Sequence, residues 1–142
     1  MAIRKRLLVH FPLRRRSRRL GAAAVELAVC LPVMVIIVFG AIEASNAIYL
    51  KQEITSAAYE AARTVTASGG TQELGESRFH EVSKARHIDN ATIAISPRVD
   101  ALTPRGTLVT VAVSARANTN SYGPSLYDNV PALTSTVKMV RQ

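Results

Sequence analysis

The chain has 142 residues, a single cysteine and a formal net charge of +8. This length accommodates one small domain and a membrane anchor. The single cysteine excludes an intramolecular disulfide, and the sequence contains no P-loop, G-x-S-x-G or dinucleotide fingerprint and no histidine in metal-ligand spacing. We therefore expect a protein that is not an enzyme, with no cofactor, no metal and no small-molecule substrate.

The N-terminal leader holds the excess of positive charge. Eight of the 18 Lys and Arg residues precede Gly21, whereas all 10 Asp and Glu residues follow it, so residues 22–142 are formally neutral. An arginine-rich arm can bind nucleic acid, but this arm runs directly into a membrane-length segment, and we expect no nucleic acid partner. The positive-inside rule favours a cytoplasmic leader that is disordered or associated with the membrane surface over residues 1–20. The leader charge nearest the apolar run consists of Arg14, Arg15, Arg16, Arg18 and Arg19.

Residues 22–42 are an apolar run, AAAVELAVCLPVMVIIVFGAI, whose only charge is Glu26. About 20 such residues, rising about 1.5 Å each, cross a hydrocarbon core about 30 Å thick. The run predicts a transmembrane helix, bent at Pro32, in which Cys30 is a small apolar filler. A charge at the bilayer centre costs roughly 2.5–3.5 kcal/mol and usually marks function. The alternative for Glu26 is that it reaches the nearby cytoplasmic interface.

The helical pattern continues beyond the apolar run. In residues 43–67, small or apolar side chains recur on one face, and most charged side chains fall on the other. Ser68-Gly69-Gly70 predicts the end of this helix. We expect one helix from about residue 22 to about residue 67, with a transmembrane inner half and an amphipathic outer half whose alanine stripe suits close helix packing.

Residues 71–142 predict a small exported domain. Apolar spacing over 71–88 predicts a short amphipathic helix, although Gly75 disfavours it. Alternation then predicts strands over 91–96, 107–119 and 133–140, separated by turn residues. Tyr122 and Tyr127 have two interpretations, exposed aromatic contact with a partner and packing within a loop, and we expect packing. The predicted fold class is α+β, a long N-terminal helix packed on a small antiparallel sheet.

The apolar run, its flanking residues and the closing strand resemble those of the TadE-like pseudopilins of tight-adherence (Flp) pilus systems. The resemblance is carried by RRLGAAAVEL at 18–27, Leu31-Pro32, Ile42-Glu43, ITSAAYEAAR at 54–63 and LTSTVKM at 133–139. It implies cleavage by a prepilin peptidase after Gly21, which leaves Ala22 as the mature N-terminus. It also implies that Glu26 meets the N-terminal amine of a neighbouring subunit. Leu27 is a departure, since the family usually carries an aromatic residue there.

The resemblance further implies partners and a location. The partners are the prepilin peptidase, other pilin or pseudopilin subunits, an inner-membrane assembly platform and the lipid bilayer. The location is the bacterial inner membrane, with a cytoplasmic N-terminus and an exported C-terminus, and after processing a surface fibre concerned with adhesion.

Physical chemistry supports these roles independently. Gly21 supplies a flexible residue without a side chain at the scissile bond, and Arg18 and Arg19 hold that bond at the inner surface. After cleavage, Glu26 lies about 6 Å along the helix axis from the Ala22 amine. An unpaired ammonium and an unpaired carboxylate are both costly in lipid, so the two groups are expected to seek each other.

Two other protein classes compete with a cleaved pseudopilin. One is an uncleaved, signal-anchored envelope protein with a small exported binding domain. The other is a secreted protein whose signal peptide is cut near Ala47. Against it, the apolar run is longer than the apolar region of a signal peptide, which usually has about 7–15 residues. The cleavage site separates the three hypotheses, because it lies after Gly21, nowhere, or near Ala47.

Overall fold

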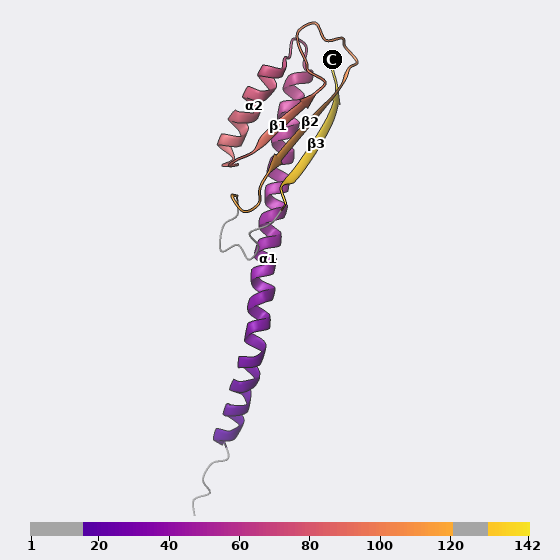
Figure 1. The fold of residues 1–142 in the computed structure, drawn as a ribbon. Helices are drawn as coiled ribbons and strands as arrows, with labels where there is room; N and C mark the ends of the chain where they lie inside the picture. Colours follow the sequence, from indigo (N-terminus) through magenta and orange to yellow (C-terminus); the bar gives the residue numbers. More distant parts are fainter. Residues whose placement is uncertain (1–15, 121–130) are drawn as a thin grey trace, which may run out of the picture. The chain divides into compact units, whose positions relative to one another are not determined.

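The computed structural model describes residues 16–120 and 131–142 (Figure 1). The described residues form two helices and a three-stranded sheet, which confirms the predicted α+β class. The elements are α1 (Arg16–Thr66), α2 (Gln72–Ala85), β1 (Thr92–Ser96), β2 (Leu108–Ala115) and β3 (Leu133–Val140). The chain divides into an N-terminal unit, Met1–Val38, and a C-terminal unit, Phe39–Gln142. Arg14, Arg15, Tyr122 and Tyr127 lie outside the described residues.

Helix α1 begins earlier than the sequence predicts. The expected start is near residue 22, after a disordered or surface-associated leader, whereas the helix begins at Arg16. The prediction is wrong here because Arg and Leu are good helix formers and one Gly in a helix interior costs only about 1 kcal/mol. The other end agrees with the sequence, since α1 stops at Thr66, just before Ser68-Gly69-Gly70.

The sheet has the order β1-β2-β3 and is antiparallel throughout. Strand β3 has the predicted bounds, but β2 ends at Ala115 instead of residue 119. Beyond β2, the Thr119 hydroxyl and the Asn120 side-chain amide both donate hydrogen bonds to the Arg116 carbonyl, at 3.1 and 2.8 Å. Such local side-chain bonds compete with strand pairing, which explains the shorter strand.

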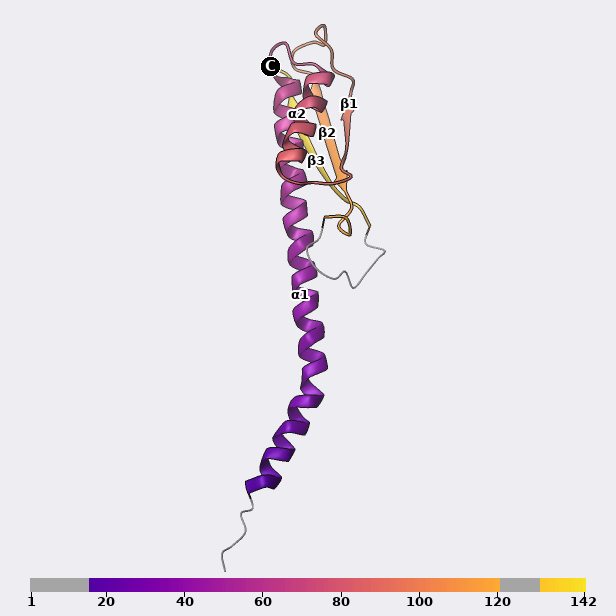
Figure 2. The ribbon, with the colours of Figure 1, turned by 90° about the vertical axis from the view of Figure 1, so that its left-hand side faces the viewer.

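The core of the C-terminal unit lies between the sheet and the two helices. Figure 2 shows α2 and the C-terminal part of α1 on the same side of the sheet. Alternate residues of β2 are buried towards the helices, as the period-two pattern predicts. The outer half of α1 packs there with its alanine stripe, and the buried set on α1 is Leu50, Ile54, Ala57, Ala58, Ala61, Ala62 and Val65.

Gly75 lets α2 approach α1 closely. It is buried inside α2, and a Cβ atom at this position would overlap the Val65 side chain and touch the Ala61 carbonyl at 3.5 Å. The residue that disfavours a helix in the sequence is therefore the one that makes helix–helix contact possible. This contact also gives the alanine stripe a helical partner within the same chain.

We expect Gly75→Ala to destabilise the C-terminal unit by about 1–2 kcal/mol, because overpacking outweighs the roughly 1 kcal/mol that Ala gains in a helix. The measurement is urea unfolding of the full chain in detergent, with protease resistance as the readout of folding. In a Val65→Ala background the blocking methyl group is absent, and Gly75→Ala should then stabilise. The same sign in both backgrounds would contradict this packing explanation.

Ser83 is an uncompensated polar group in the core. It is 7% exposed, and its hydroxyl has no hydrogen-bond partner among the described residues. Ser83→Ala removes a cost of about 1–3 kcal/mol for a buried unpaired hydroxyl. We expect a higher urea midpoint with an unchanged slope. Ser77→Ala is the control, since Ser77 is exposed on the same helix, and equal shifts in the two variants would refute the assignment.

Candidate processing and anchor segment

The apolar part of α1 is uncovered in this structure. Every residue from 21 to 38 is exposed, including Val29 at 69% and Ile36 at 67%. Within the part of the chain that the structure describes, one helix segment, inside α1, is long and apolar enough to cross a membrane. Exposed apolar surface of this extent marks a membrane or protein interaction site.

The predicted scissile bond, Gly21–Ala22, lies inside α1. A peptidase that needs an extended peptide must therefore unwind the first turns of this helix. The sequence of those turns includes Arg16, Arg18 and Arg19, and the first turn has no acidic residue. Positive charge is unfavourable at the positive end of the helix dipole, and Gly21 weakens the helix further. The start of α1 is thus chemically suited to local unwinding.

Gly21 has no packing role in the described structure. An added Cβ atom would meet nothing within 4 Å, and the same holds for Gly40 in the same helix. A requirement for glycine at position 21 would then come from processing and not from the fold. This pair of glycines gives a matched test of the cleavage site.

Glu26 lies on α1 four residues after Ala22 and is exposed. Residues four apart share one face of a helix, so Ala22 and Glu26 lie on the same side, about 6 Å apart along the axis. No ion pair or side-chain hydrogen bond joins Glu26 to another described residue. The carboxylate is free to accept a partner from outside the described chain.

The motif at residues 54–63 belongs to the core. Ile54, Ala57, Ala58, Ala61 and Ala62 are all buried with no measurable exposure. The alanines are small, and this lets α2 and the sheet lie close to α1. In this chain the apolar part of the motif is explained by packing.

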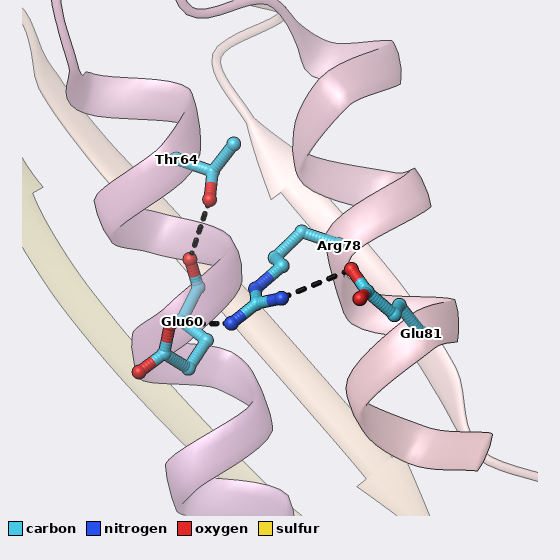
Figure 3. A network of polar contacts seen from close by, with 4 residues as sticks. All are labelled: Glu60, Thr64, Arg78 and Glu81. Carbon is cyan, nitrogen blue, oxygen red and sulfur yellow. Dashed lines mark hydrogen bonds and ion pairs between the residues drawn. The ribbon is translucent and has the colours of Figure 1, made fainter. Parts of the chain in front are cut away.

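Glu60, from the same motif, forms an ion pair that connects α1 to α2 (Figure 3). The Arg78 guanidinium lies between two carboxylates, 3.4 Å from Glu60 on α1 and 2.9 Å from Glu81 on α2. These carboxylates, Glu81 first, raise the pKa of Arg78 above its ordinary value. Because the side chains are partly exposed, the pairs orient the helices and contribute little to stability.

Several contacts near the C-terminus join residues that belong to no common sequence motif. Arg141 is 5% exposed, and its guanidinium donates a 3.0 Å hydrogen bond to the Gly70 carbonyl. The Gln142 amide donates a 2.9 Å hydrogen bond to the Thr66 carbonyl at the end of α1. Lys51 donates to the Thr134 carbonyl on β3. These contacts join residues more than 70 positions apart, so sequence spacing carries no signal for them.

The described residues contain no group of three or more His, Cys, Asp and Glu side chains that could hold a metal ion. Cys30 is a free cysteine on the exposed surface of the apolar segment. The described segment 21–42 is therefore an apolar stretch of helix with one carboxylate, Glu26.

Comparison with known proteins supports the family resemblance. Residues 21–63 match the model of the TadE-like protein family. The match begins at Gly21, contains Glu26 and ends after the motif that packs against α2. No curated protein and no solved structure matches the chain.

Proposed function

We propose that this chain, whose residues 21–63 match the TadE-like family, is a pseudopilin processed by a prepilin peptidase after Gly21. The processed chain takes part in the assembly of a Flp-type pilus or a related secretion or adhesion apparatus. Its partners are the peptidase, other pilin or pseudopilin subunits, an inner-membrane assembly platform and the bilayer. The precursor is a single-pass protein of the bacterial inner membrane, with the leader inside and the C-terminal unit exported.

One observation carries the proposal. The family match starts at Gly21, which precedes the exposed apolar segment 22–42 of α1, and the only carboxylate in that segment lies five residues after this glycine. The Arg residues before Gly21 support a scissile bond at the cytoplasmic face, by the positive-inside rule. The alternative is an uncleaved signal-anchored protein, and the continuity of α1 through Gly21–Ala22 favours it.

The test is the N-terminal residue of the membrane-fraction product, made with and without a prepilin peptidase. We expect an N-terminus at Ala22 only when the peptidase is present. Gly21→Leu should block processing, whereas Gly40→Leu should not. Neither glycine is packed against another part of the fold, so a difference between the two variants reports on processing and not on folding. An intact N-terminus in both samples would favour the uncleaved anchor, and a new N-terminus near Ala47 would identify a signal peptide.

A further inference from the structure

Strand β3 forms an outer edge of the sheet (Figure 1). Just after β3, Arg141 bonds towards β2, donating to the Thr107 carbonyl and accepting the Gly106 N–H, each at 2.9 Å. The next residue, Gln142, turns the other way and donates to the Thr66 carbonyl on α1. In an antiparallel pair, successive residues alternate between positions that bond the neighbouring strand and positions that do not. The even-numbered residues of β3 therefore present their N–H and C=O groups to the open edge.

Helix α1 occupies only the two ends of this open edge. Lys51 donates to the Thr134 carbonyl at one end, and the bond from Gln142 occupies the other. Between these ends lie Thr136 and Lys138, which are both exposed. Outside the strand pairing, their backbone groups bond no other residue that the structure describes. The middle of the edge is therefore a row of unpaired donors and acceptors, which is a template for an additional strand.

A hollow of about 410 Å³ on α1 borders this edge. Its lining consists of Lys51, Gln52, Thr55, Ser56 and Tyr59. Figure 2 shows β3 beside this part of α1, and the Thr55 hydroxyl lies 2.8 Å from the Ser135 hydroxyl on β3. The Tyr59 side chain, 49% exposed, has room for a further contact. Because a strand turns alternate side chains to opposite faces, every second side chain of an added strand would pack in this hollow.

The charges of the sheet and the hollow are both positive. Lys138 is the single charged residue in the three strands, and Lys51 is the single one among the described residues that line the hollow. No ion pair joins either lysine to another described residue. A second copy that paired through β3 would bring its own Lys138 close to this one, which is unfavourable. An extended segment with a carboxylate opposite Lys138 is favoured instead.

We propose that the β3 edge accepts an extended acidic segment of a partner polypeptide as a fourth strand. The outward groups of Thr136 and Lys138 bond its backbone, an apolar side chain packs beside Tyr59, and a carboxylate lies beside Lys138. In strand addition of this kind, backbone hydrogen bonds supply affinity and side-chain sites supply specificity. The contact requires neither cleavage after Gly21 nor a fibre, so its test is independent of the proposed function.

The test is binding of two fluorescent peptides to the full chain in detergent, measured by anisotropy. Both peptides alternate valine with threonine over about seven residues, a common strand length. The central threonine is replaced by glutamate in one peptide and by lysine in the other. We expect the glutamate peptide to bind about threefold more tightly, because opposite charges facing each other across strands are favourable and like charges are not. Lys138→Glu should reverse this preference, whereas Lys84→Glu, the same change at an exposed residue of α2, should leave it unchanged.

Thr136→Pro tests the backbone contact. Proline removes an N–H that points to the open edge, and it is tolerated at such positions of edge strands. We expect peptide affinity to fall at least about tenfold, with a urea midpoint close to that of the unmodified chain, whereas Thr136→Val keeps the N–H and should bind normally. Binding that survives Thr136→Pro, a preference that Lys138→Glu leaves unchanged, or no binding of either peptide would overturn the proposal. Dimers of the chain that compete with the peptide would identify a second copy as the occupant and would also overturn it.

Discussion

Under the proposed function, Glu26→Ala is expected to remove the chain from the assembled fibre while leaving cleavage after Gly21 largely intact. Glu26 is the only charged residue in the apolar segment 22–42, and it is exposed on α1. In lipid, the new N-terminal ammonium of one subunit and this carboxylate of a neighbour are each costly alone and favourable together. Removing the carboxylate leaves the ammonium without a partner.

Two measurements check this expectation, the N-terminal residue of the membrane product and the amount of chain in the sheared surface fraction. Glu26→Gln keeps the size of the side chain without its charge and should behave like Glu26→Ala. Glu43→Ala is the matched control, because Glu43 is the next carboxylate along α1, just beyond the apolar run. Normal surface incorporation of Glu26→Ala would disprove the pairing.

Gly70→Ala is expected to cost about 3 kcal/mol of unfolding free energy in the C-terminal unit. A Cβ atom at this position would lie 2.6 Å from the Val65 carbonyl oxygen, 2.9 Å from the Val65 carbonyl carbon and closer still to the Thr64 carbonyl oxygen. These are backbone atoms of the last turn of α1, and no side-chain rotation can relieve the clash. Movement of Gly70 would also strain its bond from Arg141.

Gly69→Ala is the control for this prediction. Gly69 has a φ of +79°, in the left-handed region, but an added Cβ would meet nothing within 4 Å. The expected cost is therefore about 1–2 kcal/mol, from backbone conformation alone. The two variants are compared by urea unfolding in detergent, with protease resistance as the readout of folding. A larger loss for Gly69→Ala than for Gly70→Ala would show that contact with α1 does not determine the requirement for glycine at position 70.

The sequence by itself determined the elements whose pattern repeats over neighbouring residues. The alanine stripe of α1, the alternation in β2 and the bounds of β3 follow from side-chain periods of 3.6 and 2. The apolar run and the TadE-like resemblance over 21–63 are also local in sequence. The start of α1 was not predicted, because the charges suggested a disordered leader and the helix propensity of Arg and Leu prevailed.

Tertiary structure alone decided which residues meet across the fold. Gly75 reads as a helix breaker, yet it is required where α2 touches Val65. Arg141 belongs to no sequence motif, yet it is buried against Gly70. The physical reason is that periodicity records which face of an element is apolar, whereas close packing depends on the distance between atoms far apart in the chain.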